Sequence, residues 1–242
     1  METIINVDDV SFSYVTQTEQ ALSHISLSVN KGDFIGIIGP SGAGKSTLAA
    51  CLSGAVPHHH TGPFFGSVMV DGHDTCEVSL TDVSQIVGSV LQDIDTQMVA
   101  SVVEDEMLFG LENFGVPHDQ IEQRVSETLE TVGISDLRDR EIATLSGGQK
   151  QKVAIAAILA MRPRVLVLDE PTAALDPASS TLVFETLREA NRALGITIVV
   201  VEQKVALLSE YCNRVLVLNH GEIALQGEPH EVFAHTDELR AI

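Results

Sequence analysis

The stretch GPSGAGKST, residues 39–47, decides the fold of this chain. It satisfies the pattern G-x-x-x-x-G-K-[ST] and lies between Phe34–Ile38, which reads as a buried parallel strand, and a run that favours a helix. Glycines let such a loop point its N–H groups at nucleotide phosphates, and the following helix adds its positive N-terminal dipole. An ordinary glycine-rich turn would not explain the Lys-Ser-Thr or its placement.

We therefore expect Lys45 to reach the β- and γ-phosphates of a nucleotide and Ser46 to ligate magnesium. The nucleotide contacts predicted in this loop are Gly39, Pro40, Ser41, Gly42, Ala43, Gly44, Lys45, Ser46 and Thr47.

The composition limits the possible partners and compartments. The 242 residues include 14 Lys and Arg against 34 Asp and Glu, a formal net charge of −20, which opposes attraction to nucleic-acid phosphates. Apolar stretches such as residues 153–161 are far shorter than the roughly 18 residues that span a bilayer, so we expect any membrane role to be peripheral. The N-terminus carries no secretion signal, which favours the cytosol. The three cysteines lack C-x-x-C spacing and are expected to be small core residues.

Short β-branched runs alternate with amphipathic stretches, which predicts an α/β fold. The predicted strands are residues 4–14, 25–29, 34–38, 165–168, 196–201, 215–218 and 222–225. The predicted helices include residues 178–193 and 204–211, and Pro229 is expected to open a final short helix. Between about Asp93 and Asp139 the pattern turns helical, which predicts a helical lobe inserted in the core. Its apolar positions at 3-to-4 spacing are Val102, Leu108 and Leu111, then Ile121, Val125, Leu129 and Val132.

A second chemical motif is RVLVLDEPT, residues 164–172, a buried strand that ends in two carboxylates. Ligands bind at the carboxyl ends of strands in open parallel sheets. Asp169 suits a contact to magnesium, and Glu170 is placed to polarise the attacking water in phosphoryl transfer. The competing interpretation is an acidic pair that stabilises a helix N-terminus.

With LSGGQ at residues 145–149, upstream of this acidic pair, the chain resembles the ATP-binding cassette family over essentially its whole length. The resemblance implies a P-loop NTPase with a RecA-like core, an antiparallel β lobe and an inserted α-helical lobe at about residues 93–160. It implies a single nucleotide-binding domain over residues 1–242. It also implies that Ser146, Gly147, Gly148 and Gln149 cap the γ-phosphate of ATP bound by the opposite subunit. A plain helix N-cap is a second interpretation of the same residues.

Three further residues match family positions. Tyr14, in VSFSY, is similar to the aromatic residue that stacks on adenine, although a core tyrosine at a strand end is the alternative. Gln92 resembles the glutamine that touches magnesium and the attacking water and whose loop couples nucleotide state to membrane subunits. Asp176, in ALDP, matches the aspartate that communicates across the dimer, with a helix-start signal before Pro177 as its alternative.

Two segments narrow the resemblance to the ATPases of energy-coupling factor transporters, which import vitamins and transition-metal ions. These segments are residues 92–113 and 53–72. The second contains His58-His59-His60, which we interpret as a solvated loop because three consecutive side chains do not converge easily on one ion.

One departure from the family concerns the histidine that bonds the γ-phosphate and steadies the water, because Gln203 stands at that position in VVVEQK. Glutamine donates a neutral hydrogen bond but cannot become a cation. The chain's own site is therefore expected to bind ATP well and hydrolyse it poorly. An engineered substitution and a tolerated neutral change are the two other interpretations.

The resulting prediction is an ATPase, with ATP and Mg²⁺ as ligands, that powers micronutrient import through an energy-coupling factor transporter. Its expected partners are a second cassette ATPase, a transmembrane coupling subunit and a substrate-binding membrane component, at the cytoplasmic face of the membrane. A heterodimer is favoured and a homodimer is possible. The alternatives are an ATPase of another transporter class and a soluble non-transport cassette protein. The transported solute is not readable from the chain.

Overall fold

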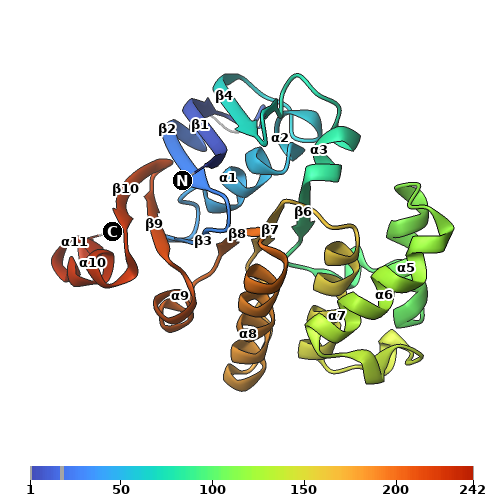
Figure 1. The fold of residues 1–242 in the computed structure, drawn as a ribbon. Coiled ribbons are helices and arrows are strands. Elements are labelled where there is room, and N and C mark those ends of the chain that lie inside the picture. Colours follow the sequence, from blue (N-terminus) through green and yellow to red (C-terminus); the bar gives the residue numbers. More distant parts are fainter. Residues whose placement is uncertain (1, 17–18, 242) are drawn as a thin grey trace.

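A computed structural model describes residues 2–16 and 19–241 of the chain. Its centre is a six-stranded sheet of order β10-β9-β3-β8-β7-β6 (Figure 1). Neighbouring strands from β9 to β6 run parallel, and β10 pairs antiparallel with β9. The strand bounds are β3 Phe34–Ile38, β6 Val87–Val90, β7 Val165–Asp169, β8 Thr197–Val201, β9 Arg214–Asn219 and β10 Glu222–Gly227.

A four-stranded antiparallel sheet of order β2-β1-β4-β5 covers one side of this centre (Figure 1). Its strands are β1 Thr3–Phe12, β2 Leu22–Asn30, β4 Phe64–Val70 and β5 His73–Asp74. In β2 buried and more exposed residues alternate, as expected for a strand with one face on the core. Helix α1, Lys45–Leu52, lies between the two sheets and buries Leu48 and Leu52 against both.

Each central strand contributes alternate side chains to two separate cores. Ile35 and Ile37 of β3 face α1 and the antiparallel sheet, whereas Phe34 faces α8 (Pro177–Leu194) and α9 (Val205–Tyr211). Burial on both faces explains why β3, β7 and β8 read as nearly continuous apolar runs in sequence.

Helices α5, α6 and α7 stand together beside the β6 edge of the central sheet (Figure 1). The remaining helix bounds are α2 Ala55–His58, α3 Leu80–Ile86, α4 Ile94–Gln97, α5 Val103–Asn113, α6 His118–Val132, α7 Gly147–Ala160, α10 Pro229–Ala234 and α11 Thr236–Ala241, with 3₁₀ turns at Ser135–Leu137 and Ile142–Thr144. Within residues 2–16 and 19–241, no helix combines the length and apolar character that crossing a membrane requires.

Two details of the predicted helices are wrong. Val102 does not belong to the buried face of α5, because its extended backbone forms a bridge with Glu141 and the helix begins one residue later. The buried apolar residues of α5 are therefore Val103, Met107 and Leu111, and Leu108 is only partly buried. The helix that Pro229 opens is not the final one either, since α11 follows it after His235 leaves the helical conformation.

Candidate nucleotide site

The loop between β3 and α1 has a backbone that its glycines make possible. Gly42 and Gly44 adopt φ angles of 82° and 98°, in the left-handed region that glycine tolerates best. A Cβ atom on Gly44 would lie 2.4 Å from the carbonyl oxygen of Ala21. The loop therefore passes too close to the neighbouring backbone for any side chain at that position.

Lys45 opens α1 and is 6% exposed. Its Nζ donates hydrogen bonds to the carbonyl oxygens of Gly39 (3.0 Å) and Pro40 (2.9 Å), so the loop folds around its own ammonium group. A phosphate in this loop would meet a buried cation and a helix N-terminus together, which is the electrostatic arrangement that favours anion binding.

Tyr14 lies beside this loop, as its predicted role requires. Its hydroxyl and the hydroxyl of Thr47 are hydrogen-bonded at 3.1 Å. A cavity of about 230 Å³ is lined by both residues, by Glu19–Ala21, and by Gly42 and Gly44–Ser46. The ring is also packed edge-on against Phe12, with centroids 4.9 Å apart, so part of the core interpretation holds as well.

Asp169 ends β7 beside the phosphate loop. Its Oδ1 is buried and finds no hydrogen-bond partner among the described residues. Burial raises the pKa of this carboxyl, against the opposing effect of a hydrogen bond from Ser46. A buried carboxylate oxygen without a partner, next to a serine hydroxyl, fits the oxygen ligands that Mg²⁺ prefers.

Glu170 is held in an unusual backbone conformation, with a φ of 46°. Its N–H donates to the carbonyl oxygen of Val201 (2.9 Å), which ties it to the end of β8. Its Oε1 accepts a hydrogen bond from Nε2 of Gln203 (2.6 Å), and Gln203 itself is exposed. Left-handed backbone at a non-glycine residue is strained, and such strain occurs preferentially at functional sites.

The residues of LSGGQ form the start of α7. Ser146 is the N-cap: its Oγ accepts from the N–H of Gln149, whose Oε1 accepts from the N–H of Ser146, so both halves of a capping box are present. Cβ atoms on Gly147 and Gly148 would lie 3.1 Å from side-chain atoms of Leu175 and Ser179. The glycines therefore let this helix start pack tightly against Leu175, which precedes α8, and against the first turn of α8.

Asp176 is the N-cap of α8. Its carboxylate accepts hydrogen bonds from the hydroxyl and the N–H of Ser179 and from the N–H of Ala178, which hold the pKa of Asp176 below its usual range. The helix-start interpretation of this residue is thus correct locally, and it leaves a dimer role open because the side chain is exposed.

Gln92 is exposed and lines a cavity of about 230 Å³ together with Glu170, Gly147 and Ala173–Leu175. Sequence reasoning missed two supports of its loop. Gln97 donates to the carbonyl oxygen of Ser89 and accepts from the N–H of Leu91, each at 3.0 Å. Lys150 of α7 forms an ion pair of 2.7 Å with Asp95 of α4. No sequence motif marks either contact.

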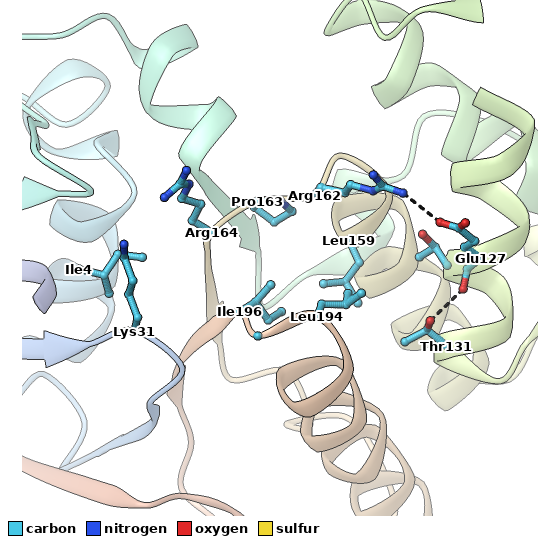
Figure 2. Close-up of a pocket in the computed structure, with 12 residues that line it drawn as sticks. Ile4, Lys31, Glu127, Thr131, Leu159, Arg162, Pro163, Arg164, Leu194 and Ile196 are labelled. Atoms are coloured by element: carbon cyan, nitrogen blue, oxygen red, sulfur yellow. Dashed lines mark hydrogen bonds and ion pairs between the residues drawn. The ribbon is translucent and has the colours of Figure 1, made fainter. Parts of the chain in front are cut away.

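A cavity of about 360 Å³ lies elsewhere, where β7 and β8 begin rather than where they end (Figure 2). Leu159, Leu194 and Ile196 form its apolar wall, and Arg162 pairs with Glu127 at 2.9 Å across it. None of the predicted nucleotide residues lines this cavity. The phosphate loop after β3 and Asp169 at the end of β7 lie instead at the opposite, carboxyl ends of the strands, where open parallel sheets bind ligands.

Comparison with known proteins decides the family. The family model described as ABC transporter matches residues 22–173. The chain belongs to the ABC transporter ATPases. This ABC ATPase is 44% identical to a provisionally named ABC transporter ATP-binding protein of Pyrococcus horikoshii, over 99% of this chain and 84% of that protein. It is 39% identical to the energy-coupling factor transporter ATP-binding protein EcfA1 of Clostridium perfringens, over 100% of this chain and 85% of EcfA1.

Among solved structures, the ABC ATPase is similar to CbiO1 of Clostridium perfringens, described as part of the ABC transporter complex CbiONQ. The TM-score is 0.88 at 34% identity, covering 100% of this chain and 94% of CbiO1. The predicted fold class and the resemblance to energy-coupling factor ATPases are thereby confirmed.

The histidine triplet and the cysteines lie outside the nucleotide contacts. His58–His60 are exposed, and Nε2 of His58 contacts the carbonyl oxygen of Thr75 at 2.9 Å. The described residues hold no group of three His, Cys, Asp or Glu side chains that could bind a metal ion. Burial raises the pKa of the Cys51 thiol to about 12 and of Cys76 to about 11, so neither is a thiolate at neutral pH.

Proposed function

We propose that this ABC ATPase hydrolyses ATP, with Mg²⁺ as cofactor, to power micronutrient import through an energy-coupling factor transporter at the cytoplasmic face of the membrane. The observation that carries the proposal is its 39% identity to EcfA1 across the whole chain. The segments at residues 53–72 and 92–113 resemble the same class. The imported solute is a vitamin or a transition-metal ion.

The chemistry follows from three carboxyl strand ends. Lys45 after β3 would take the β- and γ-phosphates, and Asp169 at the end of β7 would hold Mg²⁺ with Ser46 and Gln92. Mg²⁺ held there would neutralise charge that develops on the phosphoryl oxygens. Glu170 would polarise the attacking water, and Gln203, two residues after β8, would donate a hydrogen bond to the same oxygens. Tyr14 stacks on the adenine.

The site is completed by a second cassette. Ser146–Gln149 lie at the start of α7 and do not line the cavity formed by Tyr14 and the phosphate loop. In our proposal they cap ATP held by the partner, Asp176 communicates across the same interface, and a heterodimer is favoured. A transmembrane coupling subunit docks at the Gln92 loop, and another membrane component recognises the solute. Residues 1–242 form one nucleotide-binding domain, with residues 93–160 as its helical lobe.

We further infer that the chain's own ATP site turns over slowly. Gln203 supplies a neutral amide where the family has a histidine, and this amide is engaged with the Glu170 carboxylate. A neutral donor stabilises the charge of the transition state less than a cation does.

Co-purification tests the proposal. An affinity-tagged chain, solubilised in mild detergent from its source organism and analysed by mass spectrometry, should recover a second cassette ATPase and two kinds of multi-spanning membrane protein. The purified assembly should hydrolyse ATP only with Mg²⁺. Recovery of ribosomal or DNA-repair proteins without membrane subunits would contradict it, and so would a single membrane protein fused to another cassette.

A further inference from the structure

The three residues that follow β8 all contact the segment that follows β7. Glu202 is 2% exposed, and its Oε2 accepts a hydrogen bond of 2.5 Å from Oγ1 of the fully buried Thr172. Gln203 donates to Glu170 at 2.6 Å. Lys204 reaches further along the same segment, to Leu175 and Ser180. Two loops about 30 residues apart in sequence are therefore linked side chain by side chain.

The ammonium group of Lys204 is fully used in these contacts. Its Nζ donates to the carbonyl oxygens of Thr172 (2.7 Å) and Leu175 (3.1 Å) and to Oγ of Ser180 (2.7 Å), which exhausts its three donors. Ser180 is 1% exposed, and its hydroxyl donates in turn to the carbonyl oxygen of Asp176 at 2.8 Å. Lys204 thus fixes the backbone on both sides of Asp176.

The carboxylate of Glu202 fixes the other end of the link. Its Oε1 accepts from the N–H groups of Gln203 (2.8 Å) and Lys204 (3.2 Å). The same carboxylate also binds Thr172. A shift of the Gln203 backbone would therefore strain or break the contact to Thr172, which lies in the segment that leads to Asp176. Buried, charge-assisted contacts of this kind are stiff, since no water replaces a lost partner.

We propose that Lys204, supported by Glu202, is a positioning residue that couples Gln203 to the exposed segment around Asp176. This inference rests on the proposed function, in which Gln203 senses the terminal phosphate of the chain's own ATP and Asp176 faces the second cassette. ATP bound at this chain's site would then set the position of the segment around Asp176 that the second cassette contacts. Lys204 does not line the cavity beside the phosphate loop, so its effect reaches the nucleotide only through other residues.

The test is Lys204→Met in the full complex, because methionine keeps much of the side-chain length and loses the charge. We expect kcat for ATP to fall about tenfold to a hundredfold, the loss that small misplacements in an active site produce. The KM for ATP should stay within about twofold, because no nucleotide contact is removed. ATP-dependent association of the cassettes, followed by light scattering, should weaken. Lys204→Arg should restore part of kcat, since it returns the charge.

Lys31→Met is the matched control, because it removes the same charge from an exposed pair with Glu2 and should leave kcat unchanged. If Lys204→Met lowers the Tm strongly, Ser180→Ala replaces it; this variant removes one acceptor of the ammonium group and should lower kcat about threefold or more. If the unmutated complex hydrolyses ATP and neither Lys204→Met nor Ser180→Ala lowers its kcat, the inference is overturned and the proposed function stands. If ATP hydrolysis by the complex is absent, or is unchanged when Lys45 is replaced, the proposed function is overturned and this inference with it.

Discussion

Gln203 donates a hydrogen bond of 2.6 Å from its side-chain amide to Oε1 of Glu170, across 33 residues of sequence. Glu170 is the residue assigned to polarise water, and its left-handed backbone turns it toward the end of β8. The amide therefore directly contacts the carboxylate that we propose to be catalytic. It brings no positive charge to that position.

Glu170→Gln should keep ATP binding and trap a closed, ATP-bound pair of cassettes, because the amide cannot polarise water yet occupies the same volume. Gel filtration with ATP measures the trapped dimer. Glu185→Gln makes the same chemical change on an exposed part of α8 and should behave like the unmutated chain. With the partner's catalytic glutamate neutralised, a hydrolysis rate in Glu170→Gln equal to that of the unmutated chain would contradict the proposed role of Glu170.

Lys45→Ala should weaken ATP binding by about one to two decades, since a charge-assisted hydrogen bond is worth roughly 1.5–3 kcal/mol. Isothermal titration with a non-hydrolysable ATP analogue measures the affinity. Lys31→Ala removes the same charge far from the loop and should leave it unchanged. An unaltered affinity in Lys45→Ala would contradict the phosphate-loop assignment.

Asp169→Asn should raise the Tm of the chain in metal-free buffer at neutral pH, because a buried carboxylate with one oxygen left without a hydrogen-bond partner is destabilising and an amide carries no charge. Burial raises the folded-state pKa of Asp169 above its unfolded value. The penalty is therefore complete above the folded pKa and disappears as the pH falls below the unfolded value. Scanning calorimetry from neutral to acidic pH should show the advantage of Asn shrinking. A pH-independent difference would contradict a charge effect.

The same variant should lose Mg²⁺-dependent tightening of ATP binding, because the carboxylate oxygen proposed for the metal is gone. A stable variant with normal Mg²⁺ dependence would show that Asp169 is not a ligand.

Ser146→Ala should slow hydrolysis in the complex, but it also removes an N-cap, which costs about 0.5–2 kcal/mol. Ser146→Asp separates the two effects, because aspartate caps helices well and places a negative charge where the partner's γ-phosphate would lie. We expect Ser146→Asp to keep its Tm and lose most of its ATP turnover. Loss of stability with unchanged turnover in Ser146→Ala would leave only the N-cap interpretation.

Elements of the fold were predictable from the sequence where their own residues carry the pattern, and were missed where distant neighbours in the fold determine them. Phe34–Ile38 matches β3 in both bounds because burial on two faces makes such a strand continuously apolar. The strand β6, Val87–Val90, was missed, since its four residues include Gly88 and Ser89 and carry no such run. Gly88 is required by packing, because a Cβ there would lie 2.2 Å from Ile158, and that neighbour is invisible in the sequence.

The functional residues divide in the same way. Lys45 and Glu170 belong to motifs that specify their own surroundings. The positioning role proposed for Glu202 and Lys204 depends on the pairing of β7 with β8 in the sheet. This pairing brings Thr172 and Leu175 beside them. The only hint in the sequence was a charged residue, Glu202, directly after a buried strand. Such a residue does not reveal which side chain it contacts.

The most direct test of the account is ATP turnover of the full complex with Gln203→His, in a background where the partner's catalytic glutamate is neutralised. Turnover then reports the site built on this chain's own phosphate loop. A histidine contact that strengthens in the transition state should raise the rate about tenfold for each 1.36 kcal/mol gained. We predict a rise of about tenfold or more with the KM for ATP little changed. An unchanged or lower rate would contradict unequal ATP sites.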